Sequence, residues 1–265
     1  MQYTSKDHTF VVCAYKESEF LEKCIISVLN QNVKSNVILS TSTPNEFIMK
    51  IANKYNLKVH INNGIGDQAD NFNFAYSQVE TELVTICHQD DYYSEFYLEN
   101  AFRLINKARK PLIFFTNYIE DRGNEVVKSN TILKVKRFLL FPLRFWVLWG
   151  NVFIRTLILS LGDPICCPSV TFVKSNISAP IFNSIYKGTL DWRAWIKISK
   201  KQGQFIYSPK TLTVHRIHNE SGTTEIIINN IRSKEELEIF KLFWPDWIAK
   251  KLSRIYASSQ NSNNI

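Results

Sequence analysis

The chain has 265 residues, of which 45% are hydrophobic and 21% are charged, values typical of a globular protein with a well-formed core. This length allows one large α/β domain with an appendage. The formal net charge of +8 favours anionic partners, which include nucleic acids, membrane surfaces and phosphorylated substrates, and it does not choose among them.

The cysteines and the N-terminus indicate the compartment. Five cysteines are present and none forms a CxxC pair, so the sequence indicates neither a disulfide framework nor a structural zinc site. The segment MQYTSKDHTF at the N-terminus lacks the basic and apolar regions of a secretion signal. We therefore expect a protein of the reducing cytoplasm.

Predicted strands and helices alternate from residue 10 to residue 87. Short apolar runs predict strands at residues 10–14, 37–39, 58–61 and 83–87, and helical spacing predicts helices at 19–31, 46–55 and 70–78. This alternation predicts a mostly parallel, Rossmann-like α/β sheet with helices on both faces. Ligands of such sheets bind beyond the carboxyl ends of the strands, where polar residues follow at 15–17, 40–42 and 88–91.

Residues 128–162 form a basic and apolar insertion without an acidic residue. Pro142 and Arg144 interrupt its apolar run well before the roughly 20 residues that a transmembrane helix needs. Two interpretations remain open, an amphipathic segment at an anionic membrane surface or a core helix pair of the same domain. The basic residues are Lys128, Lys134, Lys136, Arg137, Arg144 and Arg155.

The last part of the chain contains a predicted strand at residues 204–207, a polar segment at 215–224 and a helix at 231–241 that ends at Trp244 and Pro245. Residues 258–264 are polar enough to form a frayed tail. We expect a main domain over residues 1–225 and a C-terminal helical extension over residues 226–265.

The strongest local signal is LVTICHQDDYY, at residues 83–93. An apolar strand that ends in Asp90 and Asp91 places two carboxylates at the ligand-binding edge of the sheet. Mg²⁺ and Mn²⁺ prefer oxygen ligands, and a diphosphate supplies further ones. The alternative is an Asp-Asp helix cap exposed to solvent. From these residues alone, both interpretations stay open.

Four segments resemble family 2 glycosyltransferases, the inverting enzymes with the GT-A fold. TFVVCAYKESEFLEKCIISVLNQ resembles the opening strand and helix of the family, and CHQDDYY resembles its DxD segment. LDWRAWIKIS at 190–199 resembles a later acidic segment, and TVHRIHNESGTT at 213–224 resembles the segment whose histidine reaches the metal-bound diphosphate. The segments occur in the family's order over most of the chain, which makes the match specific.

The resemblance implies roles for particular residues. Asp90 corresponds to the carboxylate that binds Mn²⁺ or Mg²⁺, and His218 to the late histidine at the metal. Asp91 corresponds to a residue that shapes the donor-sugar pocket, and Asp191 to the general base. The segments that meet the nucleotide correspond to Ala14, Tyr15 and Glu17 after the first strand and to Asp70 and Asn71 at a helix start.

Two positions depart from the family's pattern. His88 stands at the first DxD position, where an aspartate is expected to contact the ribose. Residues 40–43 are Ser-Thr-Ser-Thr, so Ser42 lies where an acidic residue would accept a hydrogen bond from a pyrimidine N3–H. A hydroxyl can accept that bond as well. We expect His88 and Ser42 to lie in the donor-binding site.

Asp191 and the two late histidines also have local interpretations. Asp191 precedes Trp192 and Trp195 on a predicted helix, and an apolar setting favours a carboxylate that takes up a proton. The alternative is an N-capping aspartate beside core tryptophans. His215 and His218 would face opposite sides of an extended segment, so we expect one metal ligand, His218, and one structural histidine.

The sequence predicts inverting transfer of a sugar from a nucleoside diphosphate, which we expect to be a UDP-sugar, to an acceptor hydroxyl in cell-surface polysaccharide biosynthesis. The acceptor would be a glycan or a lipid-linked precursor, with the protein cytoplasmic or peripheral on the inner face of the plasma membrane. The alternatives are a nucleotidyltransferase, which lacks its glycine-rich loop here, and a non-enzymatic module that binds membranes or nucleic acid. We expect no nucleic-acid partner.

Overall fold

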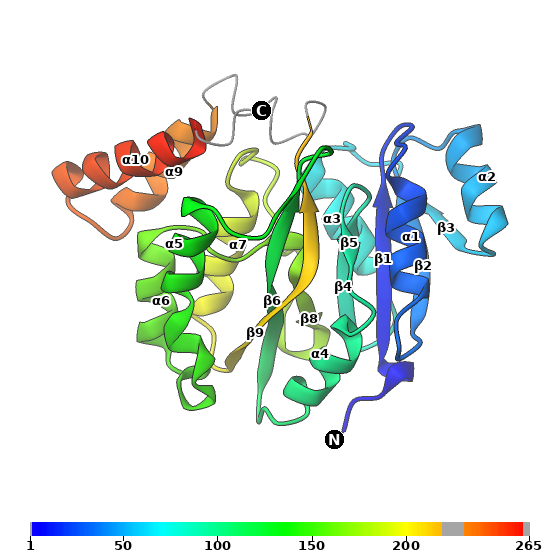
Figure 1. The fold of residues 1–265 in the computed structure, drawn as a ribbon, viewed down its shortest axis with the longest axis horizontal. Coiled ribbons are helices and arrows are strands. Elements are labelled where there is room, and N and C mark those ends of the chain that lie inside the picture. The colour runs from blue at the N-terminus through cyan, green and yellow to red at the C-terminus, as the bar shows by residue number, and fades with distance from the viewer. Residues whose placement is uncertain (1, 219–230, 262–265) are drawn as a thin grey trace.

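The computed structural model describes residues 2–218 and 231–261. Within them a nine-stranded sheet has the order β3-β2-β1-β4-β8-β6-β9-β5, and β7 pairs with β6. In Figure 1, β3 and α2 lie at one side of the molecule, and α5, α6, α9 and α10 lie at the other.

The first half of the sheet is parallel and agrees with the sequence prediction. It contains β3 (Lys58–Ile61), β2 (Asn36–Thr41), β1 (His8–Ala14) and β4 (Leu83–His88). The helices that connect these strands are α1 (Leu21–Leu29), α2 (Glu46–Lys54) and α3 (Gln68–Ser77). Their apolar stripes face the sheet, with residues such as Ile25 and Ala75 fully buried.

The second half of the sheet is mixed. The short strand β8 (Thr171–Val173) runs antiparallel to both β4 and β6 (Pro111–Asp121), and β6 runs parallel to β9 (Gln204–Arg216). Two short strands, β5 (Tyr92–Tyr93) and β7 (Val126–Val127), pair antiparallel with β9 and β6. Helix α4 (Tyr97–Ile105) precedes β6 and packs against β6 and β9.

The sequence analysis assigned neither β6 nor α4, and it predicted β9 only at residues 204–207. Pro209 and Lys210 interrupt the apolar pattern of β9, and the register with β6 shifts between Thr116 and Tyr118. Beyond this irregularity β9 continues to pair with β6 as far as Arg216, so the predicted polar segment at 215–224 begins inside a strand. Residues 219–224 lie outside the described part of the chain.

The C-terminal helices extend the core. Helix α9 (Ile231–Lys241) was predicted, and α10 (Asp246–Asn261) includes residues 258–261, where the sequence predicted a frayed tail. Residues 262–264 are not described. The ring of Trp192 in α7 (Leu190–Ser199) lies 5.3 Å from Phe240 and 5.6 Å from Tyr256, so both helices pack on α7. The predicted domain boundary at residue 225 lies between the described ranges.

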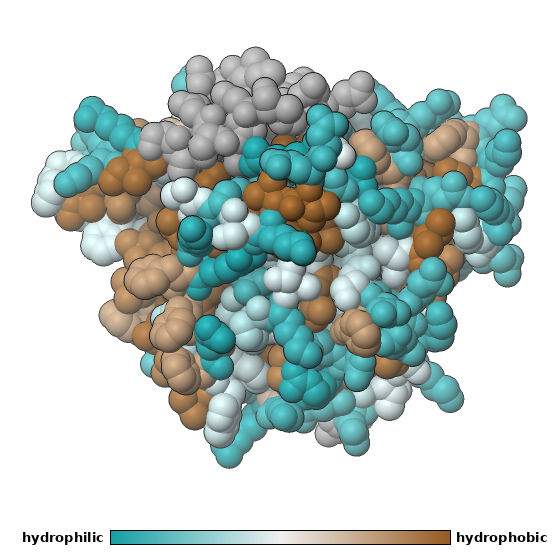
Figure 2. Space-filling view, in the orientation of Figure 1, coloured by the Kyte–Doolittle hydropathy of each residue, from teal (hydrophilic) through white to brown (hydrophobic). Residues whose placement is uncertain are grey.

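Residues 128–162 form α5 (Thr131–Leu139), two 3-10 turns (Phe141–Arg144 and Trp146–Leu148) and α6 (Val152–Leu161). The inward side chains, among them Leu143 and Trp149, are buried in the main core. The outward ones are unusually exposed, with Phe138 at 77%, Trp146 at 69% and Phe153 at 72%. Figure 2 shows apolar side chains gathered on this flank of the molecule. The segment therefore has a buried side, as a core helix pair would have, and an exposed apolar side, as an amphipathic segment would have.

Three of the six basic residues in this segment point inward. Arg155 is 1% exposed and donates to the carbonyls of Gly203 and Lys201. Arg137 donates to two backbone carbonyls, and the ammonium of Lys136 lies 5.3 Å from the centre of the Tyr118 ring. The exposed basic residues are Lys128, Lys134 and Arg144. This corrects the expectation that all six are available to a membrane.

Within residues 2–218 and 231–261, no helix has both the length and the apolar character that spanning a bilayer requires.

Candidate active site

The candidate site lies at the edge of the sheet where β1, β2 and β4 end. The register pairs Ala14 of β1 with Thr41 of β2, and Cys13 of β1 with His88 of β4. Strand β9 reaches the same region because β5, which directly follows Asp91, pairs with the end of β9. The polar residues after these strands therefore meet at one edge of the sheet.

The turn after β1 is held by Gln89, which the sequence analysis did not select. Gln89 accepts a hydrogen bond from the Tyr15 N–H at 2.8 Å and donates one to the Tyr15 carbonyl at 3.0 Å. Lys16 adopts a left-handed backbone conformation with a φ of 55°, which is uncommon for a residue with a side chain. Ala14 is buried, whereas Tyr15 and Glu17 are exposed. The side chains of Tyr15 and Glu17 are therefore accessible to a ligand.

Asp70 and Asn71 shape the loop between β3 and α3. Asp70 Oδ2 accepts hydrogen bonds from Asn62 Nδ2 and from the Gly66 N–H, each at 2.9 Å. Asn71 Nδ2 donates to the Gly66 carbonyl at 2.9 Å. A Cβ atom at Gly66 would lie 3.5 Å from the Cβ of Ser42, so this loop packs against the residues that follow β2. Contact of these residues with a nucleotide remains a prediction.

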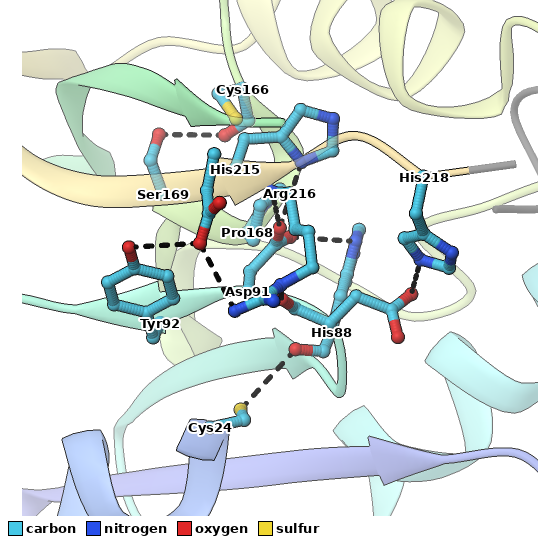
Figure 3. Close-up of polar contacts among 12 residues, drawn as sticks. Cys24, His88, Asp91, Tyr92, Cys166, Pro168, Ser169, His215, Arg216 and His218 are labelled. Carbon is cyan, nitrogen blue, oxygen red and sulfur yellow. Dashed lines mark hydrogen bonds and ion pairs between the residues drawn. The ribbon is translucent and has the colours of Figure 1, made fainter. Parts of the chain in front are cut away.

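Asp90, after β4, and His218, after β9, form a close pair. Figure 3 shows the ring of His218 pointing from the end of β9 toward the residues that follow β4. His218 Nε2 lies 3.4 Å from Asp90 Oδ2, and the Ser18 hydroxyl donates to Asp90 Oδ1 at 3.3 Å. The Asp90 side chain is 26% exposed, so it is accessible to a ligand. A carboxylate oxygen beside an imidazole nitrogen is a donor pair that suits Mn²⁺, and a carboxylate suits Mg²⁺.

Two protein ligands are few for a cation. Among residues 2–218 and 231–261, no group of three or more His, Cys, Asp or Glu side chains could hold a metal ion. A cation bound by Asp90 and His218 would therefore need further oxygen ligands from a phosphate group or from water, as Mg²⁺ commonly has in phosphate-binding sites.

Asp91 is buried and fixes the end of β9. Its Oδ1 accepts hydrogen bonds from His215 Nδ1 at 2.9 Å and from the Arg216 N–H at 2.8 Å. Burial alone would raise the pKa of Asp91, but the charge and hydrogen bond of His215, with smaller contributions from His88 and the Arg216 N–H, together outweigh it and lower that pKa. Burial likewise opposes the charged form of His215, yet Asp91 raises the pKa of His215 above its usual value. The two side chains therefore form an ion pair that joins β4 to β9.

His88 has a different environment. Its ring stacks on Phe72 with 4.7 Å between the ring centres and an angle of 15° between the planes. Burial lowers the pKa of His88, and the Asp91 carboxylate, with Nδ1 of His88 3.7 Å from its Oδ2, only partly offsets this effect. His88 is therefore neutral at pH 7 and can donate or accept a hydrogen bond.

Arg216 supports the backbone of Asp90. Its Nε donates to the Asp90 carbonyl at 3.1 Å, and its guanidinium lies 4.0 Å from the centre of the Phe20 ring. A nitrogen of the same group lies 3.3 Å from Asp121 Oδ2, which also accepts a hydrogen bond from the Tyr92 hydroxyl. Arg216 therefore connects the Asp90 loop to the end of β6.

Comparison with known proteins decides the family. The sequence profile described as Glycosyl transferase family 2 matches residues 9–177, which is well over half of the chain. The chain belongs to glycosyltransferase family 2. Membership makes the protein an enzyme that transfers glycosyl groups, and it decides against the nucleotidyltransferase and the non-enzymatic module. No protein of curated function matches the chain in sequence.

Solved structures support the fold of this family 2 glycosyltransferase. Residues 1–349 of S. aureus TarS, crystallised in complex with UDP-GlcNAc, match with a TM-score of 0.57 and 16% identity over 93% of this chain and 70% of that chain. The mannosyltransferase PcManGT from Pyrobaculum calidifontis, in complex with GDP-Man and Mn²⁺, matches with a TM-score of 0.61 and 13% identity. The match covers 99% of this chain and 77% of that chain. The predicted GT-A type of α/β fold is confirmed.

In this glycosyltransferase Asp191 lies in the first turn of α7, with Oδ1 accepting a hydrogen bond from the Trp192 N–H at 2.9 Å. Asp191 is half-buried, whereas Trp192 and Trp195 belong to the core. Burial raises the pKa of the Cys167 thiol, and the Asp191 carboxylate raises it further. The Asp191 carboxylate is therefore within electrostatic range of Cys167.

Cys166 is buried at the start of a 3-10 turn (Cys167–Ser169), whereas Cys167 is half-buried. The Tyr93 hydroxyl donates to the Pro168 carbonyl at 2.7 Å, so the turn is anchored to β5. Since burial raises the pKa of both thiols well above the usual value, neither is a thiolate at neutral pH.

Three supporting residues were missed by the sequence analysis, which are Gln89, Asp121 and Arg216. Arg216 stands inside the quoted motif between the two histidines, and Gln89 stands inside the DxD segment, so position alone could have suggested both. Asp121 ends the apolar run of β6, and the same rule that selected Asp90 would have selected it.

Proposed function

We propose that this glycosyltransferase moves a sugar, with inversion at the anomeric carbon, from a UDP-sugar to an acceptor hydroxyl. The observation that carries the proposal is the Asp90–His218 pair beside a surface-accessible turn, Tyr15–Glu17, at the carboxyl edge of a parallel sheet. TarS was crystallised with UDP-GlcNAc and PcManGT with GDP-Man and Mn²⁺, and both are similar to this chain in fold. The hydroxyl of Ser42, beside the Gly66 loop, supports a pyrimidine base.

The proposed role of each site residue follows from its position. Tyr15, Glu17 and Ser42, with the Asp70–Asn71 loop, would bind the nucleoside, and neutral His88 would donate or accept a bond to the ribose. Asp90 and His218 would hold Mn²⁺ or Mg²⁺ against the diphosphate. Such a cation neutralises charge on a diphosphate leaving group.

Asp191 would act as the general base. As the acceptor oxygen attacks the anomeric carbon, its proton moves to the Asp191 carboxylate and the bond to the diphosphate oxygen breaks. Inversion needs only this one protein group to handle a proton, because the acceptor attacks from the face opposite the leaving group. Asp191 lies in the first turn of α7 and is only half-buried, which supports access to an acceptor hydroxyl.

The enzyme would act at the inner face of the plasma membrane on a lipid-linked glycan precursor. The exposed aromatic flank formed by Phe138, Trp146 and Phe153 could insert into the headgroup region. The exposed cations of the same segment, Lys128 and Lys134 among them, complement anionic lipid. A cell-surface polysaccharide would be the product.

Asp90→Asn tests the metal assignment. The change removes one anionic ligand, so we expect Mn²⁺- or Mg²⁺-dependent release of nucleotide from a panel of UDP- and GDP-sugars to be lost while the far-UV circular dichroism is unchanged. Undiminished release by the variant, or full wild-type activity in excess chelator, would contradict the assignment.

Asp191→Asn separates chemistry from binding. We expect kcat to fall by roughly 10²-fold, the usual scale for a lost general base, with little change in the Kd for the donor. The change can be followed by released nucleotide and by calorimetry of donor binding. A collapsed donor affinity with preserved kcat would mean that Asp191 is a binding residue.

Co-sedimentation with anionic liposomes tests the membrane proposal. Wild-type protein should bind at low salt, and binding should weaken as salt increases or when Lys128, Lys134 and Arg144 become Gln. A control variant with Lys6, Lys50 and Lys58 changed to Gln loses the same charge elsewhere and should bind like wild type. Equal weakening in both variants would assign the binding to net charge, and no binding by the wild type would refute the proposal.

A further inference from the structure

The loop before α7 is bonded to a helix that follows it by more than 40 residues in sequence. Glu235 of α9 accepts three hydrogen bonds from this loop, from the Lys187 N–H at 3.0 Å, the Gly188 N–H at 2.9 Å and the Thr189 hydroxyl at 2.9 Å. Thr189 is the residue directly before α7, and Asp191 is the second residue of that helix. One carboxylate of α9 therefore fixes the backbone that leads into Asp191.

A carboxylate at this position is physically suited to the task. The first turn of a helix leaves backbone N–H groups without partners in the helix, and negative charge near a helix N-terminus is favourable. Hydrogen bonds to an ionised acceptor are shorter and stronger than neutral ones. Glu235 bonds the two N–H groups just before α7 and the hydroxyl of the N-cap residue Thr189, so its negative charge lies close to the N-terminus of α7.

Further contacts join the same two helices. Arg193 Nη2 lies 2.8 Å from Glu238 Oε2, and the Arg193 guanidinium lies 3.5 Å from the centre of the Tyr186 ring. Trp192 packs edge to face on Phe240 and donates from its ring nitrogen to the Leu159 carbonyl at 2.9 Å. The buried ring of Trp192 thus holds the residue that follows Asp191 in place. The Arg193–Glu238 pair is exposed on the side of Glu238, and such surface ion pairs contribute little.

Helix α9 also brings charge to this region. Arg232 Nε lies 2.8 Å from Glu236 Oε1, and Glu236 is fully buried. Burial alone would lower the pKa of Arg232, but Glu236 and, to a smaller degree, Tyr256 and Asp191 raise it. The guanidinium therefore remains charged within electrostatic range of Asp191.

We infer that α9 is the positioning element for the general base and that Glu235 is its positioning residue. The inference rests on the proposed function, in which Asp191 takes the acceptor proton. Residues 187–189 and α9 lie outside the segment that matches the family profile, so this arrangement is a property of this chain beyond the matched region.

The test compares Glu235→Ala with Glu238→Ala in the full chain. Both changes remove a carboxylate from α9, but Glu238 is 63% exposed and contacts Arg193 rather than the loop at 187–189. The assay is release of nucleotide from whichever of UDP-glucose, UDP-GlcNAc and GDP-mannose the wild type consumes fastest. Since misplacement of a reacting group by ~1 Å can cost about 10²-fold, we expect Glu235→Ala to lower kcat at least ~10-fold with an unchanged donor Kd, and Glu238→Ala to change kcat less than ~2-fold.

A double variant distinguishes positioning from general destabilisation. If Glu235 acts through Asp191, the Asp191→Asn, Glu235→Ala double variant should be no slower than Asp191→Asn alone. Multiplicative losses, or an unchanged kcat in Glu235→Ala, would overturn the inference. Full activity of Asp191→Asn would instead refute the proposed base itself. Glu235→Gln keeps one acceptor oxygen, so its kcat should lie between those of the wild type and Glu235→Ala. This variant serves as the test if the alanine variant does not fold.

Discussion

The buried carboxylate of Asp91 is the interaction on which the site depends. Asp91 lies three residues after the end of β4, and its bonds to His215 and to the Arg216 N–H join it to a strand end more than 120 residues later in the chain. Breaking a buried ion pair by removing one partner costs about 3–5 kcal/mol, because the other charge is left uncompensated. Together with the pairing of β5 with β9, this bond brings His218 close to Asp90. The Asp90–Asp91 pair therefore contains one residue that is buried and joins two strand ends, Asp91, and one whose side chain is accessible, Asp90.

The rest of the edge repeats this division between supporting and exposed groups. Gln89 holds the turn that presents Tyr15, and Arg216 holds the carbonyl of Asp90 through a contact that also reaches Asp121. Glu235 does the same for the entry to α7. In each case a buried or half-buried polar side chain satisfies backbone groups of a loop, and the loop can then present a more exposed side chain in a fixed position.

Much of the fold could be predicted from sequence because its first half is local. Each strand from β1 to β4 is a short apolar run next to a helix with apolar spacing, so periodicity alone suffices. The pairing of β6 with β9 joins segments about 90 residues apart and contains a register shift, which no local pattern encodes. The same limit explains the basic residues of the 128–162 segment, since whether Arg155 faces the core or solvent depends on the distant carbonyls of Gly203 and Lys201. Candidate ligands such as Asp90 could be selected from their position after a strand. The same rule reaches some supporting residues, such as Asp121, but the contacts that they make depend on segments distant in the chain.

The account requires that Asp90 and His218 share one cation only when a diphosphate completes its ligand set. Binding of Mn²⁺, followed by electron paramagnetic resonance with and without UDP, tests this most directly. The account predicts weak binding without UDP, tighter binding with it, and loss of the tightening in both Asp90→Asn and His218→Gln. Equal Mn²⁺ affinity with and without UDP, or unchanged tightening in either variant, would contradict it.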